Sequence, residues 1–252
     1  MKLTSKTKCS GMSLIEVVMV LAISALLITI AFATFGQRRG VAVDDEVNQI
    51  VAQINKIRNE AQKGSGPPSD SPALTAGETL FGQAIEFDAR CSSNGGNSCM
   101  HIYRLKRGFS TISNQPTNQI SPYESSTDIP VTENLLFQLA TKSGCNNQFY
   151  LGYKQPGSSK FCDPSLFMGA SQANPMIVIE TGSGRMSFFS TGQAQGFNPS
   201  KAANLNNYTA DRQGVLRLPI YQKQGGTPAS SQYKYNIDIN LAGGNEITTT
   251  KL

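Results

Sequence analysis

Tryptophan, histidine and charge are scarce in this chain of 252 residues. It has no Trp, a single His (His101) and only 15% charged residues. The motifs of common enzymes are also missing, because no GxSxG, no HExxH and no phosphate-binding glycine loop occurs. We therefore expect no catalytic residue, no cofactor and no enzymatic activity. With 39% hydrophobic residues, the composition also excludes a charged disordered chain.

Apolar residues are concentrated near the N-terminus, between Met12 and Phe35. No charged residue occurs from Val17 to Gln37. At about 1.5 Å per residue, a helix of that length spans roughly the 30 Å hydrocarbon thickness of a bilayer. Nothing later in the chain is comparable, so the sequence predicts one membrane-spanning helix and a polar remainder.

A secretory signal peptide and an ordinary signal anchor are two simpler interpretations of this run. Ala31-Phe32-Ala33 does offer a site of the kind that signal peptidase cleaves. Neither interpretation explains Glu16, a carboxylate that costs about 2 to 3 kcal/mol on insertion into the membrane. A buried core helix, the third alternative, would not need the three lysines Lys2, Lys6 and Lys8 before it.

The position of Glu16 relative to Gly11 is informative. A short basic stretch ends at Gly11. The apolar run that follows begins Met12-Ser13-Leu14-Ile15-Glu16, so the glutamate is its fifth residue. This arrangement, over about residues 6 to 35, resembles the class III signal of the type IV pilin and type II secretion pseudopilin superfamily. The resemblance implies that residues 1–11 are a leader and that a prepilin peptidase cuts between Gly11 and Met12 and methylates the amine of Met12. Met12 stands where the family more often has Phe.

Glu16 has an expected role in assembly. An ionised carboxylate inside hydrocarbon needs a partner, and cleavage creates one in the new amine of Met12. We predict that Glu16 of one subunit pairs with the Met12 amine of its neighbour and selects the register of the filament.

The helix is predicted to continue beyond the apolar run. An apolar residue recurs every three or four positions, at Val43, Val47, Ile50, Ile54, Ile57 and Ala61. This spacing predicts that a filament-core helix over residues 12–36 continues as an amphipathic helix over residues 37–63. The following Gly64-Ser65-Gly66-Pro67-Pro68 ends it. Residues 57–61 (IRNEA) also resemble the end of the long helix in H-type minor pseudopilins.

Residues 64–252 are predicted to form a β-rich head, because the hydrophobic period changes to two. This head is expected to lie outside the cytoplasm. A hairpin is expected around residues 181–184, and Pro219 predicts an edge strand. The polar stretches 110–132 and 190–214 are expected to be loops. The expected fold is α+β, a pilin-like lollipop with one long helix packed on a mostly antiparallel sheet. Strands are expected at residues 80–87, 100–105, 149–153, 176–180, 185–189, 215–220 and 233–241.

Cysteine usage indicates an exported head. Cys9 lies in the leader, so the mature chain keeps four cysteines, which allow three connectivities. The local pairing is favoured, and disulfides imply an oxidising compartment. A zinc site is the rival, but without any CxxC pair and with only His101 available we predict no metal. The favoured pairs are Cys91–Cys99 and Cys145–Cys162.

Two functions of different classes fit these features. The first is a minor subunit of a type IV pilus or a secretion pseudopilus, held in the cytoplasmic (inner) membrane until it is assembled. Its partners would be the prepilin peptidase, other pilin subunits, the inner-membrane assembly platform and the lipid bilayer. The second is a filament-borne subunit for DNA uptake or adhesion, with Arg104 and Lys106 as candidate DNA contacts. Without the leader the net charge is only about +2, which disfavours nucleic acid as a partner.

Overall fold

The computed structural model divides the chain into two units, residues 1–44 and residues 45–252, and each is considered by itself. Residues 31–40, 109–110, 115–119, 121–122 and 189–190 are described by their backbone alone. The structure describes residues 13–64, 74, 76–92, 95–110, 115–122, 127–132, 134–145, 149–163, 174–190, 214–223, 227–241 and 246–252.

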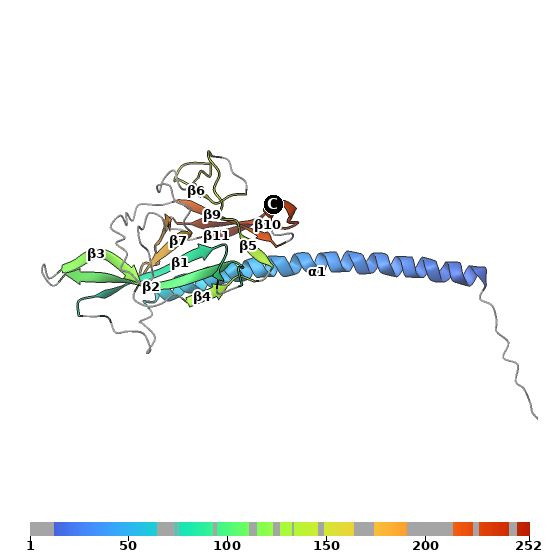
Figure 1. Ribbon diagram of the computed structural model, residues 1–252, viewed down its shortest axis with the longest axis horizontal. Helices are drawn as coiled ribbons and strands as arrows, with labels where there is room; N and C mark the ends of the chain where they lie inside the picture. Colours follow the sequence, from blue (N-terminus) through green and yellow to red (C-terminus); the bar gives the residue numbers. More distant parts are fainter. Residues whose placement is uncertain are drawn as a thin grey trace, which may run out of the picture. The chain divides into compact units, whose positions relative to one another are not determined.

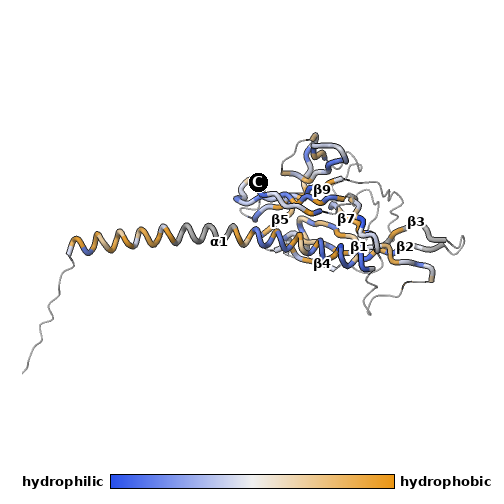
Figure 2. The backbone as a smooth tube through the Cα atoms, turned by 180° about the vertical axis from the view of Figure 1, so that it is seen from behind, coloured by the Kyte–Doolittle hydropathy of each residue, from blue (hydrophilic) through white to orange (hydrophobic). Residues whose placement is uncertain are grey.

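Helix α1 (Leu14–Gln62) is 49 residues long and begins in the first unit. Its bounds lie within two residues of those that the sequence predicts. From Leu14 to Ile30 the side chains are apolar on almost every face of the helix, as the colours of Figure 2 show, and nearly all of them are exposed. In the described part of the chain, no helix combines the length and the apolar character needed to cross a membrane.

The part of α1 in the second unit, residues 45–62, has one buried face. The residues of the predicted stripe here are all at most 4% exposed, which confirms the amphipathic pattern. Glu46 anchors this part of the helix, because its carboxylate accepts hydrogen bonds from Thr132 Oγ1 at 2.8 Å and Asn134 Nδ2 at 3.1 Å. At the other end, the Gly182 N–H donates to the Ala61 carbonyl at 3.2 Å.

The first sheet has six strands in the order β3–β2–β1–β7–β8, with β4 also paired to β2, and all of its pairs are antiparallel. The predicted hairpin is present as β7 and β8. Gly82 allows β1 to lie close to β7, because a Cβ atom there would overlap the carbonyl oxygen of Ile179. The strands are β1 (Thr79–Asp88), β2 (Cys99–Ser110), β3 (Gln115–Pro122), β4 (Thr127–Pro130), β7 (Pro175–Glu180) and β8 (Met186–Ser190).

The second sheet has five strands in the order β11–β10–β9–β5, with β6 also paired to β9, and is again antiparallel. Its strands are β5 (Leu135–Phe137), β6 (Gly152–Lys154), β9 (Val215–Gln222), β10 (Lys234–Asn240) and β11 (Ile247–Lys251).

In the second unit, the first sheet lies between the helix and the second sheet (Figure 1). Its central strands are accordingly buried on both faces, and Ile177, Val178 and Ile179 in β7 are all 0% exposed. Aromatic contacts join the two sheets, with ring centroids 5.4 Å apart for Phe87 and Phe137. This three-layer core confirms the α+β class.

The sequence prediction of an edge strand at Pro219 is wrong. Strand β9 lies inside the second sheet, with β10 on one side and both β5 and β6 on the other. Pro219 falls between the segment of β9 that pairs with β5 and the segment that pairs with β6. The missing N–H of the proline is tolerated because it falls in this gap between ladders.

The expected loop at residues 110–132 also differs from the structure, since it contains β3 and β4. Both strands pair with β2, and β4 is polar and largely exposed, as an edge strand can be. The head also has two sheets, where the sequence led us to expect one. Of the expected loop at residues 190–214, almost all lies outside the described residues.

Replacing Ile54 by alanine should lower the free energy of unfolding of the head by about 2 to 5 kcal/mol. Ile54 is 0% exposed on the helix face that packs into the head, so the shorter side chain leaves a cavity. The matched control is Asn59→Ala, an exposed position on the same helix, with an expected change within about 0.5 kcal/mol. Urea unfolding followed by tyrosine fluorescence measures both, and equal effects would contradict the buried stripe.

Candidate functional site

The start of α1 holds the first candidate site, although Gly11 and Met12 themselves lie outside the described residues. Ser13 is the N-cap, because its carbonyl accepts the N–H groups of Glu16 at 3.0 Å and Val17 at 3.2 Å. The Glu16 carboxylate in turn accepts the Ser13 N–H at 2.9 Å. This is the reciprocal half of a capping box, in which serine and glutamate stand three positions apart.

Glu16 is thus held at the helix start by one neutral donor. In the described part of the chain it makes no ion pair, and its neighbours Leu14, Ile15 and Val17 are 84%, 70% and 41% exposed. A carboxylate surrounded by uncovered apolar side chains can recruit a cation from another molecule without breaking an internal salt bridge. The structure leaves the pairing of Glu16 with Met12 as a prediction.

Two disulfides cross-link the head, Cys91–Cys99 and Cys145–Cys162, which is the favoured local connectivity. Cys91 lies in the turn between β1 and β2, and Cys99 is the first residue of β2. The turn is closed by the Cys91 N–H, which donates to the Asn97 carbonyl at 2.9 Å. Both sulfur-bearing residues are buried, at 1% and 0% exposure.

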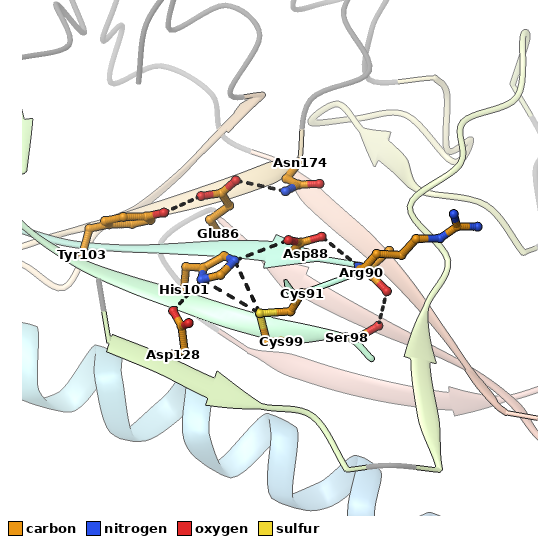
Figure 3. Close-up of a disulfide and its surroundings, with 11 residues drawn as sticks. Glu86, Asp88, Arg90, Cys91, Ser98, Cys99, His101, Tyr103, Asp128 and Asn174 are labelled. Carbon is orange, nitrogen blue, oxygen red and sulfur yellow. Dashed lines mark hydrogen bonds and ion pairs between the residues drawn. A yellow bond between two sulfur atoms is a disulfide. The ribbon is translucent and has the colours of Figure 1, made fainter. Parts of the chain in front are cut away.

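Acidic groups surround His101 on β2, next to the Cys91–Cys99 disulfide, as Figure 3 shows. Its Nδ1 lies 2.6 Å from Oδ1 of Asp128 on β4, and its Nε2 lies 3.4 Å from Oδ2 of Asp88 on β1. The Sγ atom of Cys99 is also 3.4 Å from Nε2. Because both neighbouring cysteines are joined in the disulfide, His101 has no thiol to activate as a nucleophile.

The pKa of His101 is raised above its ordinary value of 6.5. Burial is the largest single effect and lowers the pKa. The hydrogen bonds to Asp128 and Asp88, together with the negative charges of Asp128 and Glu86, outweigh it and favour the imidazolium. Glu86 is itself held by Tyr103 Oη at 2.7 Å and by Asn174 Nδ2 at 3.0 Å.

Arg104 and Lys106 share the more exposed face of β2, while Tyr103 and Leu105 are buried, as their alternation predicts. Lys106 Nζ forms an ion pair with Glu78 Oε1 at 2.8 Å, so its charge is compensated within the head.

Arg217 is likewise compensated in the second sheet. It donates Nε and Nη2 to the two carboxylate oxygens of Asp238 at 2.8 and 2.6 Å. Its guanidinium carbon lies 3.6 Å from the centre of the Phe161 ring. Lys106 and Arg217 are therefore each compensated within the head by a carboxylate.

Sequence reasoning missed the grouping of Asp88 and Asp128 with His101. The signal for part of it was present, as an aspartate three positions before Cys91 and a histidine two positions after Cys99. Asp128 could not be found in this way, because its contact with His101 depends on the pairing of β4 with β2.

Residues 6–32 match the family model described as the prokaryotic N-terminal methylation motif. No curated protein and no solved structure matches the chain. The match spans the end of the basic N-terminal stretch, the Gly11–Met12 junction and Glu16, and it agrees with the resemblance that these residues indicated.

Replacing Asp128 by asparagine should lower the pKa of His101, because it removes the negative charge at the shortest of its acidic contacts. The chain has one histidine, so a single imidazole signal reports the titration by NMR. Glu246→Gln, next to β11 in the other sheet, is the control and should leave the titration unchanged. A pKa at or below 6.5 in the unmodified chain would mean that burial outweighs the acidic neighbours.

Proposed function

We propose that this chain, which carries the N-terminal methylation motif of type IV pilins and pseudopilins, is a non-enzymatic minor subunit of a type IV pilus or a type II secretion pseudopilus. A prepilin peptidase removes residues 1–11 and methylates Met12. The mature subunit is then built into a helical filament through the first half of α1. The observation that carries this proposal is the uncovered apolar surface of α1 from Leu14 to Ile30.

That surface is expensive to leave in water. Burying one large aliphatic side chain contributes roughly 1.5 to 3 kcal/mol, and more than ten such side chains are exposed along this part of the helix. A helix that is apolar on all faces is normally covered by lipid or by other helices. We infer that the bilayer covers it before assembly and that the helices of neighbouring subunits cover it in the filament.

Glu16 supplies selectivity within this apolar surface. In the single chain it caps its own helix through Ser13. In the filament we expect the amine of Met12 from the adjacent subunit to take this place, which turns two costly charges into one buried pair. The pair forms only in one register, because every other register leaves both charges without a partner.

The proposed location follows from both ends of the molecule. Lys2, Lys6 and Lys8 favour a leader on the cytoplasmic side of the inner membrane. The two disulfides favour a head outside the cytoplasm. A single-pass precursor of this kind would be handed to the inner-membrane assembly platform after cleavage.

The alternative of a filament-borne subunit for DNA uptake or adhesion receives less support. Its candidate residue Lys106 is paired with Glu78, and Arg217 is paired with Asp238. Phosphate binding would have to compete with these internal carboxylates. The length of the head and its polar loops favour a minor subunit, because a bulky head would crowd a dense lattice of identical copies.

Replacing Gly11 by alanine should block cleavage and leave a full-length precursor in the membrane. The measurement is mass spectrometry of the N-terminus in cells that produce a prepilin peptidase. The unmodified chain should begin at a methylated Met12. A chain that begins at Thr34 would instead support a secretory signal peptide, cut after Ala33.

Two substitutions of Glu16 separate helix capping from charge pairing. Glu16→Gln keeps an oxygen that can accept the Ser13 N–H but removes the charge, whereas Glu16→Ala removes both. If pairing with Met12 drives assembly, both variants should be cleaved and both should be depleted from sheared filaments by at least about tenfold, the effect of roughly 1.4 kcal/mol. Normal incorporation of Glu16→Gln would show that the cap is sufficient and would contradict the charge pairing. Glu60→Gln, far along the same helix, is the control.

A further inference from the structure

Four metal-binding side chains converge where β1 ends and β2 begins. Asp88, Cys91, Cys99 and His101 each offer one ligand atom, and these atoms all lie within 4.8 Å of one another. Aspartate, thiolate and imidazole are all ligands that Zn²⁺ accepts. We propose that, while Cys91 and Cys99 are thiols, these four residues bind one Zn²⁺ ion, and that formation of the Cys91–Cys99 disulfide releases it.

The distances fit a tetrahedral zinc ion. With bonds of about 2.0 to 2.3 Å, ligand atoms around Zn²⁺ stand roughly 3.3 to 3.8 Å apart. His101 Nε2 lies 3.4 Å from Cys99 Sγ, 4.0 Å from Cys91 Sγ and 3.4 Å from Asp88 Oδ2. Three edges of the tetrahedron are therefore close to their final lengths. The main change required is that the two sulfur atoms separate, which follows when the bond between them is absent.

Neighbouring groups already orient the ligands. Asp128 Oδ1 lies 2.6 Å from His101 Nδ1, so the neutral imidazole keeps its proton on this nitrogen, and the lone pair of Nε2 faces the cluster once Nε2 has lost its proton. The backbone N–H of Arg90 donates to Asp88 Oδ1 at 2.8 Å, which leaves Oδ2 toward His101. Figure 3 shows this arrangement, with Asp128 on the far side of the imidazole from Asp88. A carboxylate behind a ligating histidine is the common outer shell of zinc sites.

Burial also suits a closed site. Cys91 and Cys99 are almost completely buried, whereas the side chains of His101 and Asp88 are 17% and 24% exposed. The ion would reach the cluster from the side of the histidine and the aspartate. The buried sulfur atoms would form the inner wall, where thiolates without a cation would be costly.

The chemistry balances in both directions. Binding replaces the two thiol protons of Cys91 and Cys99 by one Zn²⁺ and releases them, together with the Nε2 proton wherever His101 is an imidazolium. A disulfide-bearing oxidant then takes two electrons from the Cys91 and Cys99 thiolates and two protons from water and becomes a dithiol, while the Cys91–Cys99 bond forms and Zn²⁺ leaves. A dithiol reductant reverses the oxidation. The metal would hold Cys91 and Cys99 together, apart from Cys145 and Cys162, before the head meets an oxidising compartment.

The test uses the full-length chain in detergent with Cys9→Ser, kept reduced by a phosphine and titrated with Co²⁺ alone, then with Zn²⁺ as competitor. We expect one equivalent of Co²⁺ to bind with a thiolate-to-metal charge-transfer band, and Zn²⁺ to displace it. In native mass spectrometry the chain should gain one zinc and lose two protons. After oxidation to the disulfide, the band should be absent.

Variants identify the ligands. Cys91→Ser with Cys99→Ser should abolish the charge-transfer band, whereas the matched pair Cys145→Ser with Cys162→Ser should retain it. His101→Ala and Asp88→Asn should each weaken Co²⁺ binding at least about tenfold, and Asp128→Asn, which keeps all four ligands, by about 10- to 100-fold.

Three results would overturn the proposal. The first is a reduced chain without a charge-transfer band, and the second is a band that survives the loss of Cys91 and Cys99. The third is unchanged affinity in both His101→Ala and Asp88→Asn. None of these results depends on cleavage or filament assembly, so the zinc proposal and the proposed function can fail separately.

Discussion

The burial of one long helix is the constraint on which the rest of this molecule depends. Residues 45–62 of α1 bury their apolar stripe in their own head, whereas Leu14 to Ile30 expose apolar side chains on nearly every face. The first half therefore needs a second environment, and the methylation motif at its start is consistent with lipid followed by a filament core.

Glu16 is the only carboxylate between Leu14 and Ile30, so it makes one position along this apolar part of the helix different from the others. Apolar packing alone would allow two helices to slide past one another in steps of a turn, since every face of the helix is similar. The proposed pairing of Glu16 with the N-terminus of a neighbour would break this equivalence, because it is available in only one register. In the single chain the carboxylate of Glu16 is partly satisfied by the hydrogen bond that it accepts from the Ser13 N–H.

The head combines a buried three-layer core with two disulfide cross-links, of which Cys91–Cys99 is itself buried. Strands such as β7 are buried on both faces, and the aromatic pair of Phe87 and Phe137 joins the two sheets. The Cys91–Cys99 disulfide closes a short loop, whereas the Cys145–Cys162 disulfide holds a longer segment that contributes Leu151 and Tyr153 to the core. At the Cys91–Cys99 loop, Asp88 and Asp128 lie next to His101 and favour its protonated form, which raises its pKa.

Period and spacing in the sequence determined the long helix, its buried stripe and the β7–β8 hairpin, and favoured the local disulfide pairing, because each depends on residues that are near one another in the chain. The methylation motif could be recognised in the same way, since it lies within residues 6–32. Only the tertiary structure decided that Pro219 lies inside a sheet, that β3 and β4 extend the first sheet, and that Asp128 contacts His101. These features arise from pairing between distant strands, and the free energy of that pairing depends on which neighbours are available and not on the local pattern alone.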